Sequence, residues 1–199
     1  MSNRVLKSAL LLAFAAFGAI AQAQEEPPSR VGRIAVAQGQ VSISGDTGEA
    51  AQAATVNWPV SAHDLITTGR GARTELRVGS TAIRLDGDSS LEVTELDDNT
   101  MRLRLHYGTA SIRISNPEVL GGFELTTPQG RIRLQEPGRI RVDAERTPDT
   151  SSMTVFDGVA VVEGGGASIN LRAGKRAELR DDDVRTAQAG RDGFDDWSA

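Results

Sequence analysis

Apolar and polar residues alternate along most of the chain between residues 74 and 180. The pattern is clearest at residues 101–107, where Met101, Leu103 and Leu105 alternate with polar side chains. A period of two places every second side chain on one face of a strand, which is typical of half-buried sheet. The alternation therefore predicts an all-β fold with almost no helix before the C-terminal segment.

Gly, Pro, Asp and Asn divide the pattern into short strands. The expected strands are residues 31–36, 40–44, 74–78, 81–85, 90–94, 100–107, 110–114, 123–127, 131–134, 139–142, 154–156, 159–163 and 168–171. Gly108 is expected to separate two of them. Short strands without long crossovers favour a rolled or solenoid-like antiparallel architecture, with a sandwich as the alternative.

The domain organisation follows from the same pattern and from the two ends of the chain. Residues 31–180 have the size of one domain and contain no interdomain linker, so we expect a single all-β domain there. Residues 24–30, rich in Glu and Pro, form the expected linker before it. Residues 181–199 form an acidic C-terminal tail whose aspartates at 181–183 are expected to be solvated.

The N-terminus has the features of a bacterial Sec-type signal peptide. Arg4 and Lys7 precede an apolar stretch, and Ala21-Gln22-Ala23 supplies a small-x-small cleavage site, so residues 1–23 are expected to be removed after Ala23. The alternative is an uncleaved anchor, but the apolar run is shorter than the about 20 residues that span a bilayer. The sequence thus predicts a periplasmic or secreted protein with no stable membrane insertion after removal of the leader.

Composition restricts the function further. The net charge is −5, which argues against general binding to nucleic acid. There is no cysteine, so an oxidising compartment offers the chain no disulfide to form.

Few residues suggest chemistry. His63 and His106 are the two histidines, and no Gly-x-Ser-x-Gly motif surrounds a serine, although a triad could still assemble in space. Asp86 and Asp88 could bind calcium, but they flank Gly87 where a turn is required, and the turn interpretation is favoured. Glycines 164–166 precede no helix and make no phosphate cradle. The sequence therefore predicts no catalytic residue, no cofactor and no metal.

Arginines provide the candidate binding residues. They occur in pairs spaced two apart, so that each pair projects from one face of a strand: Arg102 and Arg104, Arg131 and Arg133, and Arg139 and Arg141. If these strands are neighbours, they form a face able to hold carboxylates or phosphates. The alternative, which we favour, is cross-strand pairing with acidic residues on adjacent strands, namely Glu75, Glu92, Glu95, Glu124 and Asp143.

An ordered series of segments resembles the FecR domain, the periplasmic part of iron-citrate sensor and anti-sigma regulator proteins. The matching segments are residues 64–69, 72–76, 83–93, 103–112, 123–128, 155–161 and 171–177. Among them, Phe123-Glu124-Leu125-Thr126-Thr127-Pro128 resembles the family's threonine-proline strand end. Gly193-Phe194-Asp195-Asp196-Trp197 resembles the segment that follows the domain in exported proteins of this kind.

The resemblance implies an all-β, non-enzymatic module that passes a signal by protein contact, with addition of a partner strand at a sheet edge as the natural mode. The chain differs from the full regulators in its leader and in the absence of cytoplasmic sigma-binding helices. We therefore expect an exported stand-alone FecR-domain protein that binds another envelope protein in signalling or assembly. The alternative hypothesis is binding of an anionic envelope polymer, peptidoglycan or lipopolysaccharide, through the arginine face.

Overall fold

The computed structural model describes residues 30–45 and 50–199. The predicted signal peptide, its cleavage site at Ala23 and nearly all of the predicted linker lie outside the described residues. Within these residues, no helix combines the length and the apolar character needed to cross a membrane. Nearly all regular structure is β-strand, which confirms the all-β prediction.

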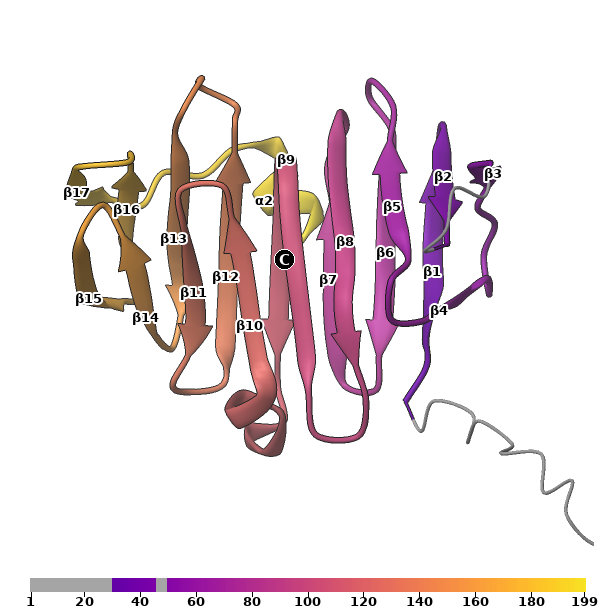
Figure 1. Ribbon diagram of the computed structural model, residues 1–199, viewed down its shortest axis with the longest axis horizontal. Coiled ribbons are helices and arrows are strands. Elements are labelled where there is room, and N and C mark those ends of the chain that lie inside the picture. Colours follow the sequence, from indigo (N-terminus) through magenta and orange to yellow (C-terminus); the bar gives the residue numbers. More distant parts are fainter. Residues whose placement is uncertain (1–29, 46–49) are drawn as a thin grey trace, which may run out of the picture.

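All the strands belong to one sheet, which β9 (Met101–Ile114) folds into two layers (Figure 1). The first layer contains, in order of pairing, β3 (Gln52–Ala53), β2 (Val41–Ser44), β5 (Leu65–Thr68), β8 (Ser89–Leu96), the first half of β9, β10 (Phe123–Thr127), β11 (Gly130–Leu134), β14 (Val159–Gly164) and β15 (Ala167–Arg172). The second layer contains β4 (Pro59–Val60), β1 (Gly32–Gln38), β6 (Arg73–Val78), β7 (Thr81–Leu85), the second half of β9, β12 (Gly138–Ala144), β13 (Ser151–Asp157), β16 (Lys175–Leu179) and β17 (Val184–Gln188).

Neighbouring strands are antiparallel except β9 and β10, which run parallel. The parallel pairing follows from the connection between them, because the chain leaves β9 in the second layer and returns to the first through the short 3-10 helix η1 (Pro117–Gly122). Asn116 caps this helix by accepting a hydrogen bond from the backbone N–H of Glu118. The folded sheet stays open at its edges, so the architecture is a two-layered roll.

Gly108 does not end a strand, contrary to the expectation of a break there. It is the point at which β9 bends from the first layer into the second, with φ of 98°. Inward-facing residues change phase at this bend, because Leu105 is buried before it and Ala110 after it, while Tyr107 is exposed. A side chain at this position would meet Ser89, whose Cα lies 2.4 Å from an ideal Cβ, so only glycine fits.

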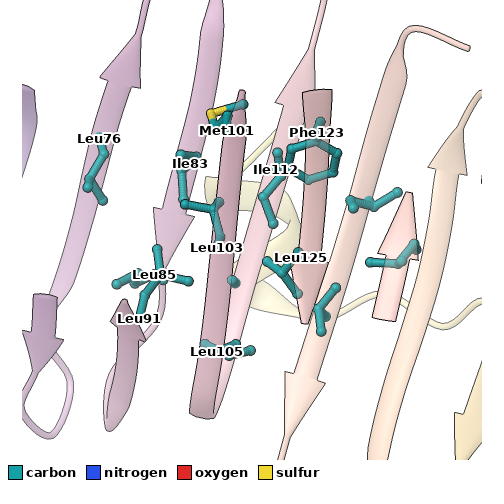
Figure 2. Packing of buried hydrophobic residues seen from close by; sticks show 14 of the residues in the cluster. Leu76, Ile83, Leu85, Leu91, Met101, Leu103, Leu105, Ile112, Phe123 and Leu125 are labelled. Atoms are coloured by element: carbon teal, nitrogen blue, oxygen red, sulfur yellow. The ribbon is translucent and has the colours of Figure 1, made fainter. Parts of the chain in front are cut away.

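The two layers share one apolar core. Buried residues from both layers form a single cluster, which includes Ile83 and Ile112 of the second layer and Leu103 and Leu125 of the first. Figure 2 shows members of this cluster from β6, β7, β8, β9 and β10. Because every second residue of these strands enters the core, the alternate residues form the two outer faces, where polar side chains gather.

The segment expected as an acidic tail contains regular structure. β17 extends the second layer by pairing with β16, and the helix α2 (Gly193–Trp197) lies against the outer face of the same layer (Figure 1). Asp192 caps α2 in a reciprocal capping box, in which its side chain accepts from the backbone of Asp195 and the Asp195 side chain accepts from its backbone. The aspartates at 181–183 remain at the surface.

Candidate functional site

The six candidate arginines are divided between the two outer faces of the roll. Arg102 and Arg104 lie on β9 and Arg131 and Arg133 on β11, all in the first layer. The remaining pair on β12 belongs to the second layer. The fold therefore creates two separate arginine clusters instead of one continuous face.

Three of these four first-layer arginines face carboxylates on neighbouring strands. Arg102 lies 3.3 Å from Glu95 of β8, and both Arg131 and Arg133 bind Glu163 of β14. A hydrogen bond from Arg131 and the charges of Arg133 and Arg131 lower the pKa of the Glu163 carboxyl below its ordinary value, against the opposing effect of burial. These are exposed cross-strand pairs of the kind expected to contribute little to stability. Arg102, Arg131 and Arg133 are therefore already engaged by carboxylates of the same face.

The second-layer arginines are covered by the C-terminal segment. Arg141 Nη1 donates to Asp192 Oδ2 at 2.8 Å and to Asp195 Oδ2 at 2.9 Å. Arg139 Nη1 donates to the carbonyl of Asp195 at 3.2 Å, and its guanidinium lies 4.5 Å from the centre of the Phe156 ring. Arg139 is only 3% exposed, which is rare for a charged residue and reflects this cover.

Arginines from β6 and β7 complete the same surface. Arg84 Nη1 donates to the carbonyl of Ser198 at 2.9 Å, and its Nε pairs with Glu75 at 2.6 Å. Arg73 of β6 lies 5.3 Å from the centre of the Trp197 ring. We call the four residues Arg73, Arg84, Arg139 and Arg141 the arginine platform. Sequence reasoning identified only the latter two, because β6, β7 and β12 meet only in the folded sheet.

Aromatic side chains of α2 stack on this platform. The rings of Phe194 and Trp197 lie 5.8 Å apart and are stacked. The guanidinium groups of Arg73 and Arg141 lie 5.9 Å and 5.8 Å from the centre of the Phe194 ring. Cation–π contacts of this type replace the apolar packing that usually holds a helix on a sheet. The sequence offered one signal of this helix, the Asp192-x-x-Asp195 spacing of a capping box.

The two capping aspartates of α2 have pKa values that are shifted in opposite directions. Burial is the largest single effect on Asp192 and raises its pKa. The hydrogen bond and charge of Arg141, together with the backbone hydrogen bonds from Phe194 and Asp195, nevertheless place this pKa below its ordinary value. Burial raises the pKa of Asp195 above its ordinary value, against the opposing backbone hydrogen bond and the charge of Arg141. Asp195 Oδ1 and Arg139 Nε are buried without a hydrogen-bond partner. Asp195 Oδ1 therefore carries a cost of desolvation, and Arg139 Nε offsets its own in part through the charge of Asp157 at 3.9 Å.

A polar cleft of about 530 Å³ lies next to the N-terminus of α2. Its lining includes Arg141, Asp143, Arg146 and Arg176, with Asp192 of the C-terminal segment forming part of the wall. Arg146 Nη2 donates to the carbonyl of Gly87 at 2.6 Å, which ties the β12–β13 loop to the β7–β8 turn. The cleft has the volume of small-molecule sites, but its lining is far more polar than theirs.

Two edge strands lie at the same end of the roll (Figure 1). Among the described residues, no strand pairs with the outer side of β15 or of β17. Directly after β15, Ala173 N–H donates to the Gly158 carbonyl at 3.2 Å. By alternation along the strand, the backbone groups of Ser168, Asn170 and Arg172 therefore point outward.

The same reasoning applies to β17. Ala189 N–H donates to the Gly174 carbonyl at 2.9 Å, so Val184, Thr186 and Gln188 direct their backbone groups away from β16. Free N–H and C=O groups in a row form a template on which another strand can pair. The two edges are therefore candidate surfaces for strand addition.

Among the other residues considered from the sequence, His106 and Asp86 have side-chain partners. His106 Nε2 lies 2.8 Å from Glu92 Oε2, and Asp86 accepts a hydrogen bond from Arg73 at 3.1 Å. Asp88 lies in the turn after Asp86 and has a φ of 52°. Within residues 30–45 and 50–199, no group of three or more His, Cys, Asp or Glu side chains is arranged to hold a metal ion.

Comparisons with known proteins agree with the fold. Residues 64–161 match the family described as FecR protein. Two crystal structures of a putative anti-sigma factor from Parabacteroides distasonis are similar, with TM-scores of 0.57 and 0.56 and identities of 14% and 15%. Each covers 67% of this chain, and the match covers 64% and 63% of those chains, so the chain spans less than two thirds of their length. A comparison with curated proteins finds no match.

Proposed function

Because residues 64–161 are a FecR domain, we propose that this protein is a non-enzymatic binding module of the bacterial cell envelope that contacts another envelope protein in signalling or assembly. The FecR match carries the proposal. The similarity in fold to the Parabacteroides distasonis structures supports a signalling role over an assembly role. The signal peptide features of residues 1–23 support action in the periplasm or outside the cell.

Strand addition is the mode of contact that we propose. An extended partner segment gains affinity from main-chain hydrogen bonds and specificity from pockets for alternate side chains. β15 and β17 offer such hydrogen bonds at one end of the roll, and neither edge contains proline. Strand addition also requires no catalytic residue, which agrees with the proposal of a non-enzymatic binding module.

Proline scanning of the two edges tests this mode. Asn170→Pro and Thr186→Pro each remove one outward-facing N–H and leave the ladders to β14 and β16 intact, since proline is tolerated where the N–H faces solvent. Asn170→Thr and Thr186→Val are the matched controls, because they change the side chain and keep the N–H. Each protein would be tagged, crosslinked in the periplasm of the source bacterium, and recovered at low and at high salt.

The proposal predicts a discrete protein partner that survives high salt, is lost with one proline variant and is retained with its control. Equal recovery of that partner by both proline variants and by the wild type would contradict strand addition. Recovery of cell-wall or lipid material alone, and only at low salt, would favour the polymer hypothesis, because contacts between arginine and anions are screened by ions.

The polymer hypothesis receives less support from the geometry. Of the four first-layer candidates, Arg102, Arg131 and Arg133 already face glutamates of the same layer. The arginines of the second layer are engaged by the protein's own C-terminal segment. If polymer is nevertheless recovered at low salt, Arg102→Glu combined with Arg104→Glu should abolish its retention, and unchanged retention would exclude these arginines as the binding face.

A further inference from the structure

We propose that the arginine platform is a peptide-binding site, and that residues 192–198 of this chain are its built-in ligand, which a partner segment of the same acidic and aromatic chemistry replaces. The ligand chemistry is a short helix in which two aspartates flank a phenylalanine and a tryptophan follows. This surface is separate from the strand edges on which the proposed function relies, so either inference can fail alone.

The contacts of α2 resemble those of a recognition interface more than those of a protein core. Phe194 is 2% exposed, yet it is not a member of the apolar cluster between the layers. Its neighbours on the sheet are the guanidinium groups of Arg73 and Arg141, and it stacks on Trp197. Tryptophan and arginine are enriched at the residues that dominate binding between proteins.

Polar contacts fix the orientation of the segment. Arg141 binds both capping aspartates, at 2.8 Å and 2.9 Å. Arg139 and Arg84 donate to the main-chain carbonyls of Asp195 and Ser198, at 3.2 Å and 2.9 Å. Hydrogen bonds to main-chain carbonyls can form with peptides of many sequences, whereas the contacts to the two carboxylates and the stacked rings require a particular sequence.

The docked segment is built to be released. Ala189, Gly190 and Arg191 connect it to β17 without regular structure, and Gly190 has open space around it. The strands beneath are paired to one another through their backbones, and α2 takes no part in these ladders. Asp195 Oδ1 and Arg139 Nε, which make no hydrogen bond here, lie in this interface, and both gain access to water when the segment leaves.

Release would also uncover functional groups. Arg84 and Arg139 are 9% and 3% exposed while the segment is docked. Asp192 forms part of the wall of the polar cleft, so undocking opens this cleft beside the platform. A partner that supplies the same aspartates and rings would occupy the platform and free the C-terminus of this chain.

Competition with a labelled peptide tests the inference. The probe is a fluorescent peptide with the sequence of residues 189–199, and the proteins are the full chain and its variant with Phe194→Ala and Trp197→Ala. In the wild type the tethered segment competes at a high effective concentration. We therefore expect the variant to bind the peptide at least tenfold more tightly than the wild type does. A peptide carrying Asp192→Ala and Phe194→Ala is the control and should not bind.

Two further measurements make the result decisive. Arg141→Glu in the variant background should abolish peptide binding, while Asn170→Pro at the distant edge should leave it unchanged. Peptide binding that is absent from the variant, or that ignores Arg141→Glu, would overturn the proposal. Hydrogen exchange on the wild type is independent of any substitution: amides of residues 194–198 should exchange much faster than those of β12, and equal protection would also overturn it.

Discussion

Gly108 carries the bend that joins the two layers, and its replacement by alanine gives the sharpest test of the fold. At φ of 98°, an alanine would adopt a backbone conformation that costs about 1–3 kcal/mol. Its Cβ would also lie 2.3–2.5 Å from atoms of Ser89. Overpacking of this kind costs a further about 1–3 kcal/mol.

Ser89 has little freedom to move away from the new methyl group. Its backbone N–H donates to Thr68 Oγ1 at 3.0 Å, and its Oγ accepts from the backbone N–H of Thr109 at 2.9 Å. Any shift of Ser89 therefore breaks hydrogen bonds that hold β8 to β5 and β9. We expect Gly108→Ala to lower the free energy of unfolding by about 3–5 kcal/mol, a large part of the about 5–15 kcal/mol typical of a domain.

Gly174 provides the matched control. Its φ is 81°, but an added Cβ would have no atom within 4 Å, so Gly174→Ala carries the backbone cost without the clash. Equilibrium unfolding in urea, followed by far-ultraviolet circular dichroism, gives both values. A difference between the two variants smaller than about 0.5 kcal/mol, which is the usual scatter of independent sites, would refute the argument for close packing at the bend.

The other predictions concern the faces of the roll. Phe194→Ala should lower the free energy of unfolding by less than the about 2–5 kcal/mol expected of Leu125→Ala. The loss is limited because α2 can leave the sheet while the core between the layers stays intact. A larger loss in urea unfolding would mean that α2 is part of the core. Since the folded-state pKa of Asp195 is raised, the folded protein takes up a proton more readily than the unfolded chain, and this group adds stability as the pH falls through that raised pKa toward the ordinary value of 3.8. Arg141, Arg139 and Asp192 surround Asp195. The pKa of Asp192 is shifted in the opposite direction, so the stability that Asp192 contributes is lost only at still lower pH. The stability of the wild type relative to Asp195→Asn should therefore rise as the pH falls from neutral toward the ordinary aspartate pKa of 3.8, and a fall of this relative stability in urea unfolding would contradict the sign. Arg102→Ala should change the free energy of unfolding by less than about 1 kcal/mol, because its pair with Glu95 is half exposed; a thermal melt that shifts strongly would disagree.

Much of the candidate site could not be predicted from the sequence, because its residues come together only through pairing of distant strands. Spacing two apart correctly placed Arg139 beside Arg141 on one outer face, because strand periodicity is local. It could not place Arg73 and Arg84 with them, since these residues lie on β6 and β7 and reach the same face only through pairing across the sheet. The remaining four candidate arginines lie on the opposite face. Which face a strand contributes to depends on whether it belongs to the layer of the first half of β9 or to that of the second half.

The sequence by itself determined the all-β class, the strand periodicity and the FecR resemblance, because alternation and turn residues act over a few positions. The role of Gly108 shows the limit of that information: a glycine between two apolar runs indicates either a break or a bend, and only the contact with Ser89 decides for the bend. The tertiary structure alone placed Phe194 and Trp197 on the arginine platform. Their attachment joins residues more than 100 positions apart in the chain, as in the bond from Arg84 to Ser198, and such contacts arise only when the whole sheet has formed.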